Sequence, residues 1–115
     1  KTMEKTLTWQ QFEQVDMRVG TILKVEEFPK ARNPAFILHI DFGEAIGGLK
    51  SSAQITDFYQ PESLIGKQVI AVVNFPSKQI GPVRSQCLVT GFHHGDQGVV
   101  LATPDLPVPN GSKLA

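Results

Sequence analysis

The sequence predicts a mainly β fold, a small closed barrel of five strands with a short N-terminal helix and a C-terminal extension. Short runs in which apolar and polar residues alternate recur along the chain, and one helical segment lies between the third and the fourth run. The chain has 115 residues, of which 41 % are hydrophobic and 19 % are charged, and this composition suits one domain with its own core.

The first element is a short helix over about residues 8–14. Thr8 can cap its N-terminus, and Gln11 follows three residues later, which is the pattern of a capping box. Trp9, Phe12 and Val15 are spaced so that they share one face of the helix. A helix of this length is unstable alone, so we expect it to dock on another surface.

Three strands follow, each with one buried face. From Val15 to Val25 the period is two, which places Leu23 on the buried face and Ile22 on the other, and Gly20 indicates a bulge or a sharp bend. Residues 36–42 form the second strand, a glycine-containing turn spans residues 43–48, and residues 49–56 return as the third strand.

The second half adds a helical turn over residues 59–66, opened by Pro61, and an apolar strand over residues 67–75 that is buried on both sides. Residues 86–92 form a fifth strand, residues 98–101 a further short one, and the tail is rich in proline. This order matches the oligonucleotide/oligosaccharide-binding barrel (OB-fold), which places its helix between strands three and four and binds ligands on strands two and three.

Three strand-like runs contain Ser, Thr, Gln, Asn and a few bases but no acid: Lys50–Thr56, Asn74–Ile80 and Ser85–Gly91. Side chains of this kind favour a ligand that accepts hydrogen bonds. The alternative is that they satisfy strand edges and turns, and Asn74 in particular can fix a turn.

Charge and cysteine usage exclude several classes of protein. The 11 Lys and Arg residues balance 11 Asp and Glu residues, unlike a strongly basic nucleic-acid-binding domain. The single cysteine, Cys87, cannot form an intrachain disulfide, and we interpret it as a small buried hydrophobe. The adjacent His93 and His94 point apart in a strand, and no third ligand is suggested. We therefore expect no metal, no cofactor, no catalysis and no membrane insertion, and a cytoplasmic location.

Several motifs closely resemble those of the CsaA family, small bacterial and archaeal export-related chaperones built on a tRNA-binding-type domain. The similarity covers about residues 12–113. The motifs are Phe12–Ile22, Pro29–Pro34, Asp41–Gly43, Ser51–Ile55, Val72–Pro76 and Pro109–Gly111.

The resemblance implies a homodimer that binds unfolded or precursor proteins. Residues 1–14 would be a tail and short helix that serve dimerisation, and residues 15–115 a tRNA-binding-type OB-fold domain with a C-terminal dimerisation extension. The alternative is a structure-specific tRNA-binding protein that uses the same face. Against this alternative, tRNA-binding relatives carry a Ser-Glu-Gly-Met-like segment where this chain has Ser85–Leu88.

The candidate site follows from the polar runs and the bases within them. The residues expected to contact peptide or tRNA are Lys50, Ser51, Ser52, Gln54, Asn74, Lys78, Arg84, Ser85 and Gln86. Cations position a nucleic acid through its phosphates, although ordinary solubilising charge is the alternative for the three bases. Phe28 and Phe92 lie next to loops and are the phenylalanines expected to be exposed as apolar peptide contacts.

Overall fold

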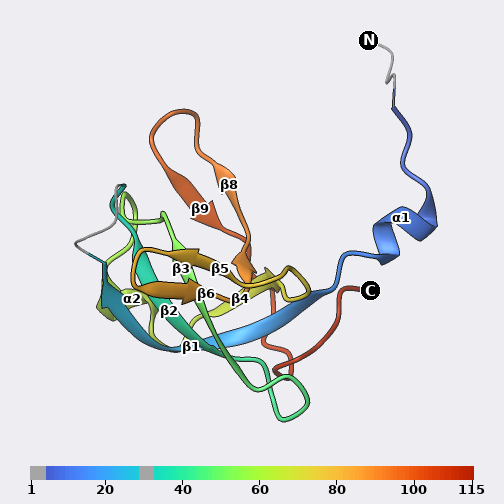
Figure 1. Cartoon of the computed structure of the whole chain (residues 1–115), viewed down its shortest axis with the longest axis horizontal. Coiled ribbons are helices and arrows are strands. Elements are labelled where there is room, and N and C mark those ends of the chain that lie inside the picture. Colours follow the sequence, from blue (N-terminus) through green and yellow to red (C-terminus); the bar gives the residue numbers. More distant parts are fainter. Residues whose placement is uncertain (1–4, 29–32) are drawn as a thin grey trace.

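The computed structural model describes residues 5–28 and 33–115, and its central feature is a nearly closed antiparallel barrel with strand order β3-β2-β1-β4-β7 (Figure 1). The predicted OB-fold is confirmed. The elements are α1 (Trp9–Glu13), β1 (Met17–Glu27), β2 (Phe36–Asp41), β3 (Gly48–Ala53), α2 (Pro61–Leu64), β4 (Gln68–Val72), β5 (Lys78–Ile80), β6 (Val83–Ser85), β7 (Leu88–Val89), β8 (Gly91–His93) and β9 (Val99–Leu101).

The N-terminal helix forms with the predicted capping box. The Thr8 hydroxyl accepts a hydrogen bond from the Gln11 amide at 3.1 Å, and the Gln11 side chain accepts one from the Thr8 amide at 3.0 Å. The helix buries none of its own residues, and it stands on an arm away from the barrel (Figure 1). The cap satisfies the first backbone groups of the helix, but within the described residues the helix buries none of its side chains.

The alternation predicted for the first strand is wrong at Ile22 and Leu23. The pairing of β1 with β2 shifts between Ile22 and Lys24, so that Ile22 faces Ile40 and is buried while Leu23 turns out to solvent. This irregularity is a β-bulge, in which one extra residue reverses the faces of those that follow. Gly20, where a bulge or bend was expected, instead fits a close approach, because a Cβ there would lie 2.6 Å from the Ile40 side chain.

The second, third and fourth predicted strands and the helical turn opened by Pro61 are all present as β2, β3, β4 and α2. The predicted fifth strand over residues 86–92 is broken in two at Thr90. The Thr90 hydroxyl and amide both donate to the carbonyl of Ile70, at 2.7 and 2.9 Å. The chain turns a corner there: β7 pairs with β4 inside the barrel, and β8 leaves it to pair with β9 in a projecting hairpin (Figure 1).

Side chains close the barrel along the free edge of β3, where the segment around residues 85–87 passes. The Lys50 amide donates to the Gln86 side chain at 2.9 Å, and the Gln86 amide donates to the Lys50 carbonyl at 2.7 Å. The Ser52 amide donates to the Ser85 hydroxyl at 3.1 Å, and the Ser51 hydroxyl donates to the Cys87 carbonyl at 3.0 Å. We call these contacts the seam.

The C-terminal extension runs back along the start of β1. The Gly111 amide donates to Val19 at 2.7 Å, the Val19 amide to Ser112 at 3.0 Å, and the Leu114 amide to Met17 at 2.9 Å. A Cβ at Gly111, whose φ is +90°, would lie 2.6 Å from the Phe42 carbonyl oxygen. Glycine is thus required there, and the tail ends beside the base of the N-terminal arm (Figure 1).

Gly20→Ala is expected to destabilise the barrel, because its methyl group would overlap the side chains of Ile40 and Phe42. Overpacking of this kind costs about 1–3 kcal/mol of unfolding free energy. The control is Gly48→Ala, whose Cβ would meet nothing closer than the Ile40 carbonyl oxygen at 3.7 Å. Urea denaturation measures both variants, and equal midpoints for the two would contradict the close approach at Gly20.

The thiol of Cys87 is expected to react slowly in the folded protein. Burial raises its pKa to about 11, so the reactive thiolate is scarce at pH 8. A raised pKa also means that folding favours the protonated thiol; this contribution is complete below the unfolded pKa of about 8.5 and is lost as the pH rises toward 11. A colorimetric thiol reagent at about pH 8 measures the rate with and without urea. Rapid stoichiometric labelling without urea would contradict the burial.

Candidate ligand-binding groove

The three polar runs meet around one open groove on the outside of the seam. The groove has a volume of about 680 Å³ and is lined by Ser52, Phe75, Pro76, Ser77, Lys78, Gln79, Ile80, Ser85, Cys87 and Leu88. Ser52 comes from the first run, the residues from Phe75 to Ile80 from the second, and Ser85, Cys87 and Leu88 from the third. The structure therefore brings Ser52 together with residues that lie 23 to 36 positions later in the sequence.

The lining of the groove combines exposed apolar side chains with polar ones. Phe75 and Leu88 are 55 % and 50 % exposed, which is unusual for side chains of their size and polarity. Ser52, Ser77 and Gln79 add hydroxyl and amide groups, and Lys78 adds one cation. Sites of this composition hold apolar side chains and orient the ligand through a few hydrogen bonds.

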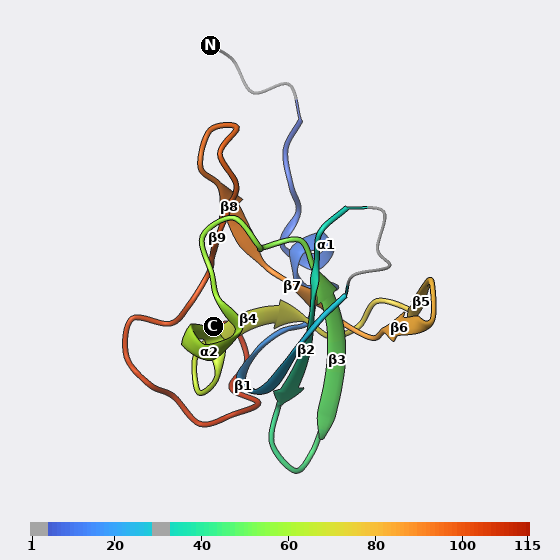
Figure 2. The same cartoon turned by 90° about the vertical axis from the view of Figure 1, so that its left-hand side faces the viewer.

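One wall of the groove is the β5–β6 hairpin, which was not predicted as a hairpin. It turns at Gly81, whose φ is +57°, and stands beside β3 (Figure 2). A small apolar cluster of Phe28, Ala35 and Ile37 packs against Ile80 and Val83 of the hairpin. The cluster fixes the hairpin to the barrel and so defines the shape of the groove.

The structure tests the predicted exposure of Phe28 and Phe92. Phe28 is only 6 % exposed, because it lies in the cluster under the hairpin, and its expected exposure is wrong. Phe92 is 69 % exposed, as expected, but it lies on β8 opposite Val100 and does not line the groove. The apolar groove residues Phe75 and Leu88 were missed, since alternation in the sequence assigns apolar side chains to the core by default.

Several of the expected ligand-binding residues serve the seam instead. Ser51 is only 1 % exposed, so its predicted contact with a ligand is wrong. The side-chain oxygen of Gln86 is engaged by the Lys50 amide. Ser85 accepts from the Ser52 amide and also lines the groove, so it can act in both roles. Gln54 is exposed just beyond the end of β3.

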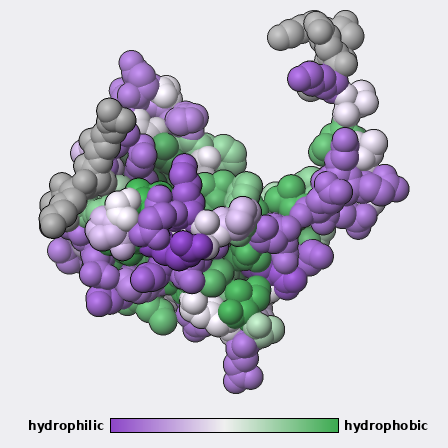
Figure 3. Space-filling model, in the orientation of Figure 1, coloured by the Kyte–Doolittle hydropathy of each residue, from purple (hydrophilic) through white to green (hydrophobic). Residues whose placement is uncertain are grey.

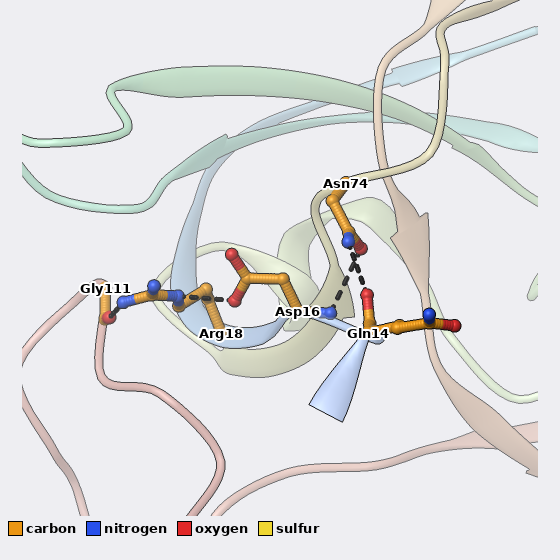
Figure 4. A network of polar contacts seen from close by, with 5 residues as sticks. All are labelled: Gln14, Asp16, Arg18, Asn74 and Gly111. Carbon is orange, nitrogen blue, oxygen red and sulfur yellow. Dashed lines mark hydrogen bonds and ion pairs between the residues drawn. The ribbon is translucent and has the colours of Figure 1, made fainter. Parts of the chain in front are cut away.

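Asn74 anchors the N-terminal arm (Figure 4). Its side-chain oxygen accepts from the Asp16 amide at 3.0 Å, and its side-chain nitrogen donates to the Gln14 carbonyl at 2.7 Å. Next to it, Asp16 and Arg18 form an ion pair at 2.7 Å, and Arg18 also donates to the Gly111 carbonyl at 3.0 Å. We therefore assign Asn74 to positioning the arm, in line with the structural alternative raised for it.

The three basic residues that were expected to contact a ligand, Lys50, Lys78 and Arg84, do not all line the groove. Lys78 lines the groove, and Arg84 lies on the hairpin, where its guanidinium is 3.5 Å from the Gln79 side-chain oxygen. Lys50 faces outward on β3 and lines a second hollow of about 370 Å³, together with Leu23, His39, Ile40, Gly48, Leu49 and Gln86. Residues 29–32, which include most of the Pro29–Pro34 motif, lie outside the described residues.

Charged side chains surround this second hollow. Oε1 of Glu26 lies 2.6 Å from Nε2 of His39 and 3.9 Å from the Lys24 ammonium. The hydrogen bond from His39, and then the charge of Lys24, hold the pKa of Glu26 below its usual value. Sequence reasoning missed Lys24 and His39, because only the strand register shows that they are neighbours of Lys50.

A separate apolar surface lies where the N-terminal arm meets the C-terminus. A cavity of about 250 Å³ is lined by Trp9, Phe12, Glu13, Val15, Lys113, Leu114 and Ala115. Leu7, Trp9 and Leu114 are exposed here, and Figure 3 shows apolar atoms on the arm and on the adjoining body. In the described part of the chain, α1 and α2 are each far too short to span a bilayer.

Comparison with known proteins shows the family to which this chain belongs. Residues 17–113 match the model of the family described as "Putative tRNA binding domain". The methionine–tRNA ligases of Flavobacterium johnsoniae and Pyrococcus horikoshii are 31 % and 33 % identical to the chain, which aligns over 94 % and 96 % of its length. The chain spans only about 15 % of the length of these two ligases.

Two solved structures match over their full length. The crystal structure of the chaperone CsaA from Bacillus anthracis is 45 % identical with a TM-score of 0.91, and it covers 96 % of this chain. The CsaA chaperone protein from Picrophilus torridus is 47 % identical with a TM-score of 0.88 over the same share. In both cases 100 % of the matched chain is covered. The chain therefore belongs to the family of putative tRNA-binding domains and is a CsaA-type member of it.

Proposed function

We propose that this protein is a non-enzymatic chaperone that binds unfolded or precursor polypeptides in the cytoplasm and keeps them competent for export. The observation that carries the proposal is the groove with Phe75 and Leu88 exposed in its lining. The two CsaA structures, which are titled as chaperones, support it.

The groove suits an unfolded segment rather than one defined ligand. Exposed apolar area binds the apolar side chains that a folded client would bury. The hydroxyls of Ser52 and Ser77 and the amide of Gln79 can pair with the backbone of an extended peptide, which is the same in every client. Among the described residues that line the groove, Lys78 is the only charged one, so this part of the lining selects little by charge.

We further propose a homodimer, in which residues 1–14 and the C-terminal part of the domain of residues 15–115 form the interface. The capped helix α1 exposes Trp9 and buries none of its residues. A helix of five residues is not stable in isolation, so a second copy would supply the missing docking surface. Two grooves on one dimer would also hold a long client more tightly than one.

Binding of tRNA is the second candidate function. The family match and the ligase relatives favour it. Lys50, Lys78 and Arg84 with the nearby Ser52 and Gln54 would contact the RNA, and so few cations would give a weak and salt-sensitive interaction.

Phe75→Ser combined with Leu88→Ser should weaken client binding by roughly tenfold or more, because burial of a large apolar side chain contributes about 1.5–3 kcal/mol. Both side chains are half exposed, so the fold should tolerate the change. Ile65→Ser removes an equally exposed apolar side chain outside the groove and is the control. Light scattering during aggregation of a denatured client measures protection at near-stoichiometric dimer. Failure of the unmodified protein to suppress aggregation at several-fold excess would refute the chaperone function.

Multi-angle light scattering should give twice the chain mass of 12.6 kDa. Leu7→Ser combined with Trp9→Ser removes the exposed apolar side chains of the arm and should shift the mass toward that of the monomer. Ile65→Ser again serves as the control. A monomeric mass for the unmodified protein would refute the dimer without bearing on the groove.

A further inference from the structure

Three nitrogen-bearing side chains form a straight row across the outer face of the sheet. The register places Lys24 of β1 opposite His39 of β2, and His39 opposite Lys50 of β3. Neighbouring strands lie about 4.8 Å apart, so the three side chains rise from adjacent positions on the face where these strands lie side by side (Figure 2). We call Lys24, His39 and Lys50 the cationic row.

The row owes its composition to the bulge in β1. Without the extra residue at Leu23, Lys24 would fall on the opposite face from His39. The bulge also turns Leu23 outward, where it lines the second hollow beside His39 and Lys50. The hollow therefore offers an apolar surface next to positive charge, a combination that suits a nucleotide with its phosphate.

Glu26 is the acid that faces the row. Its carboxylate contacts His39 and Lys24, and the charge of Lys50 also lowers its pKa. Among the described residues, the charged groups that face His39 are thus Lys24 and Glu26 from β1 and Lys50 from β3. Asp41, two residues along β2, is instead engaged by the Gly43 amide at 2.9 Å. At neutral pH Glu26 cancels one of the two lysine charges.

We propose that the cationic row binds phosphodiester groups of RNA, that Glu26 is its internal counter-ion when RNA is absent, and that protonation of His39 strengthens binding. This proposal rests on tRNA binding, the second candidate function, and specifies its contacts and its pH dependence. Protonation of His39 would raise the net charge of the row with Glu26 from one to two. Lysine binds phosphate as a point charge, and a protonated imidazole donates a hydrogen bond to it.

Fluorescence anisotropy of labelled total tRNA at about pH 6 and pH 8, over a series of salt concentrations, tests the proposal. The unmodified protein should bind several-fold more tightly at the lower pH. His39→Gln should abolish this difference, and Glu26→Gln should tighten binding several-fold at the higher pH. Lys50→Gln should reduce the slope of log K against log salt by about one. Lys67→Gln, an exposed lysine outside the row, should behave like the unmodified protein.

The outcomes separate the row from tRNA binding itself. If tRNA binds but His39→Gln retains the pH dependence, the proposed role of the cationic row is refuted. The same holds if Glu26→Gln does not tighten tRNA binding. In both cases tRNA binding itself, the second candidate function, still stands. If tRNA does not bind at either pH at low salt, both are wrong. If a polyglutamate peptide of matched charge displaces tRNA as well as unlabelled tRNA does, the row is a general anion site and its assignment to RNA is wrong. All four exchanged side chains are at least partly exposed, and circular dichroism checks that each variant folds.

Discussion

The seam between β3 and residues 85–87 is the constraint on which the rest of the structure depends. A barrel must pair its two edge strands, and here side chains replace much of the usual ladder of backbone hydrogen bonds. Gln86 engages both backbone groups of Lys50, and the Ser51 hydroxyl satisfies the Cys87 carbonyl inside the wall. Because the seam sets where residues 75–88 lie against β3, it places the hairpin and the groove.

The seam also explains why the side chains that form it are serine and glutamine rather than charged residues. A hydroxyl or an amide can satisfy a buried backbone group without the cost of burying a charge. Asn74 uses the same chemistry to hold the arm at the end of β4. Many uncharged polar side chains in this protein therefore serve closure and anchoring, and others, such as Ser52 and Ser77, line the groove.

The sequence predicted most of the fold because alternation and caps are local signals. The helix at Thr8 and the strand of residues 36–42 needed no knowledge of distant contacts. The bulge at Leu23 and the corner at Thr90 arise from pairing with remote strands, so a local period cannot locate them. The same limit applies to the site. Ser51 and Ser52 are identical neighbours, and only barrel closure makes one a wall residue and the other a groove residue.

The groove and the cationic row lie next to each other, but they would bind their ligands through different interactions. Ser52 lines the groove, and Lys50, two residues earlier on the same face of β3, lines the hollow beside the row. Apolar contacts in the groove depend little on ionic strength, whereas the row attracts phosphates through charges that salt screens. Since a closed barrel holds both surfaces rigidly, neither ligand needs to reshape the other's site. One CsaA-type barrel would therefore present the proposed polypeptide surface and the proposed RNA surface together, and the salt concentration and pH would decide how strongly RNA binds.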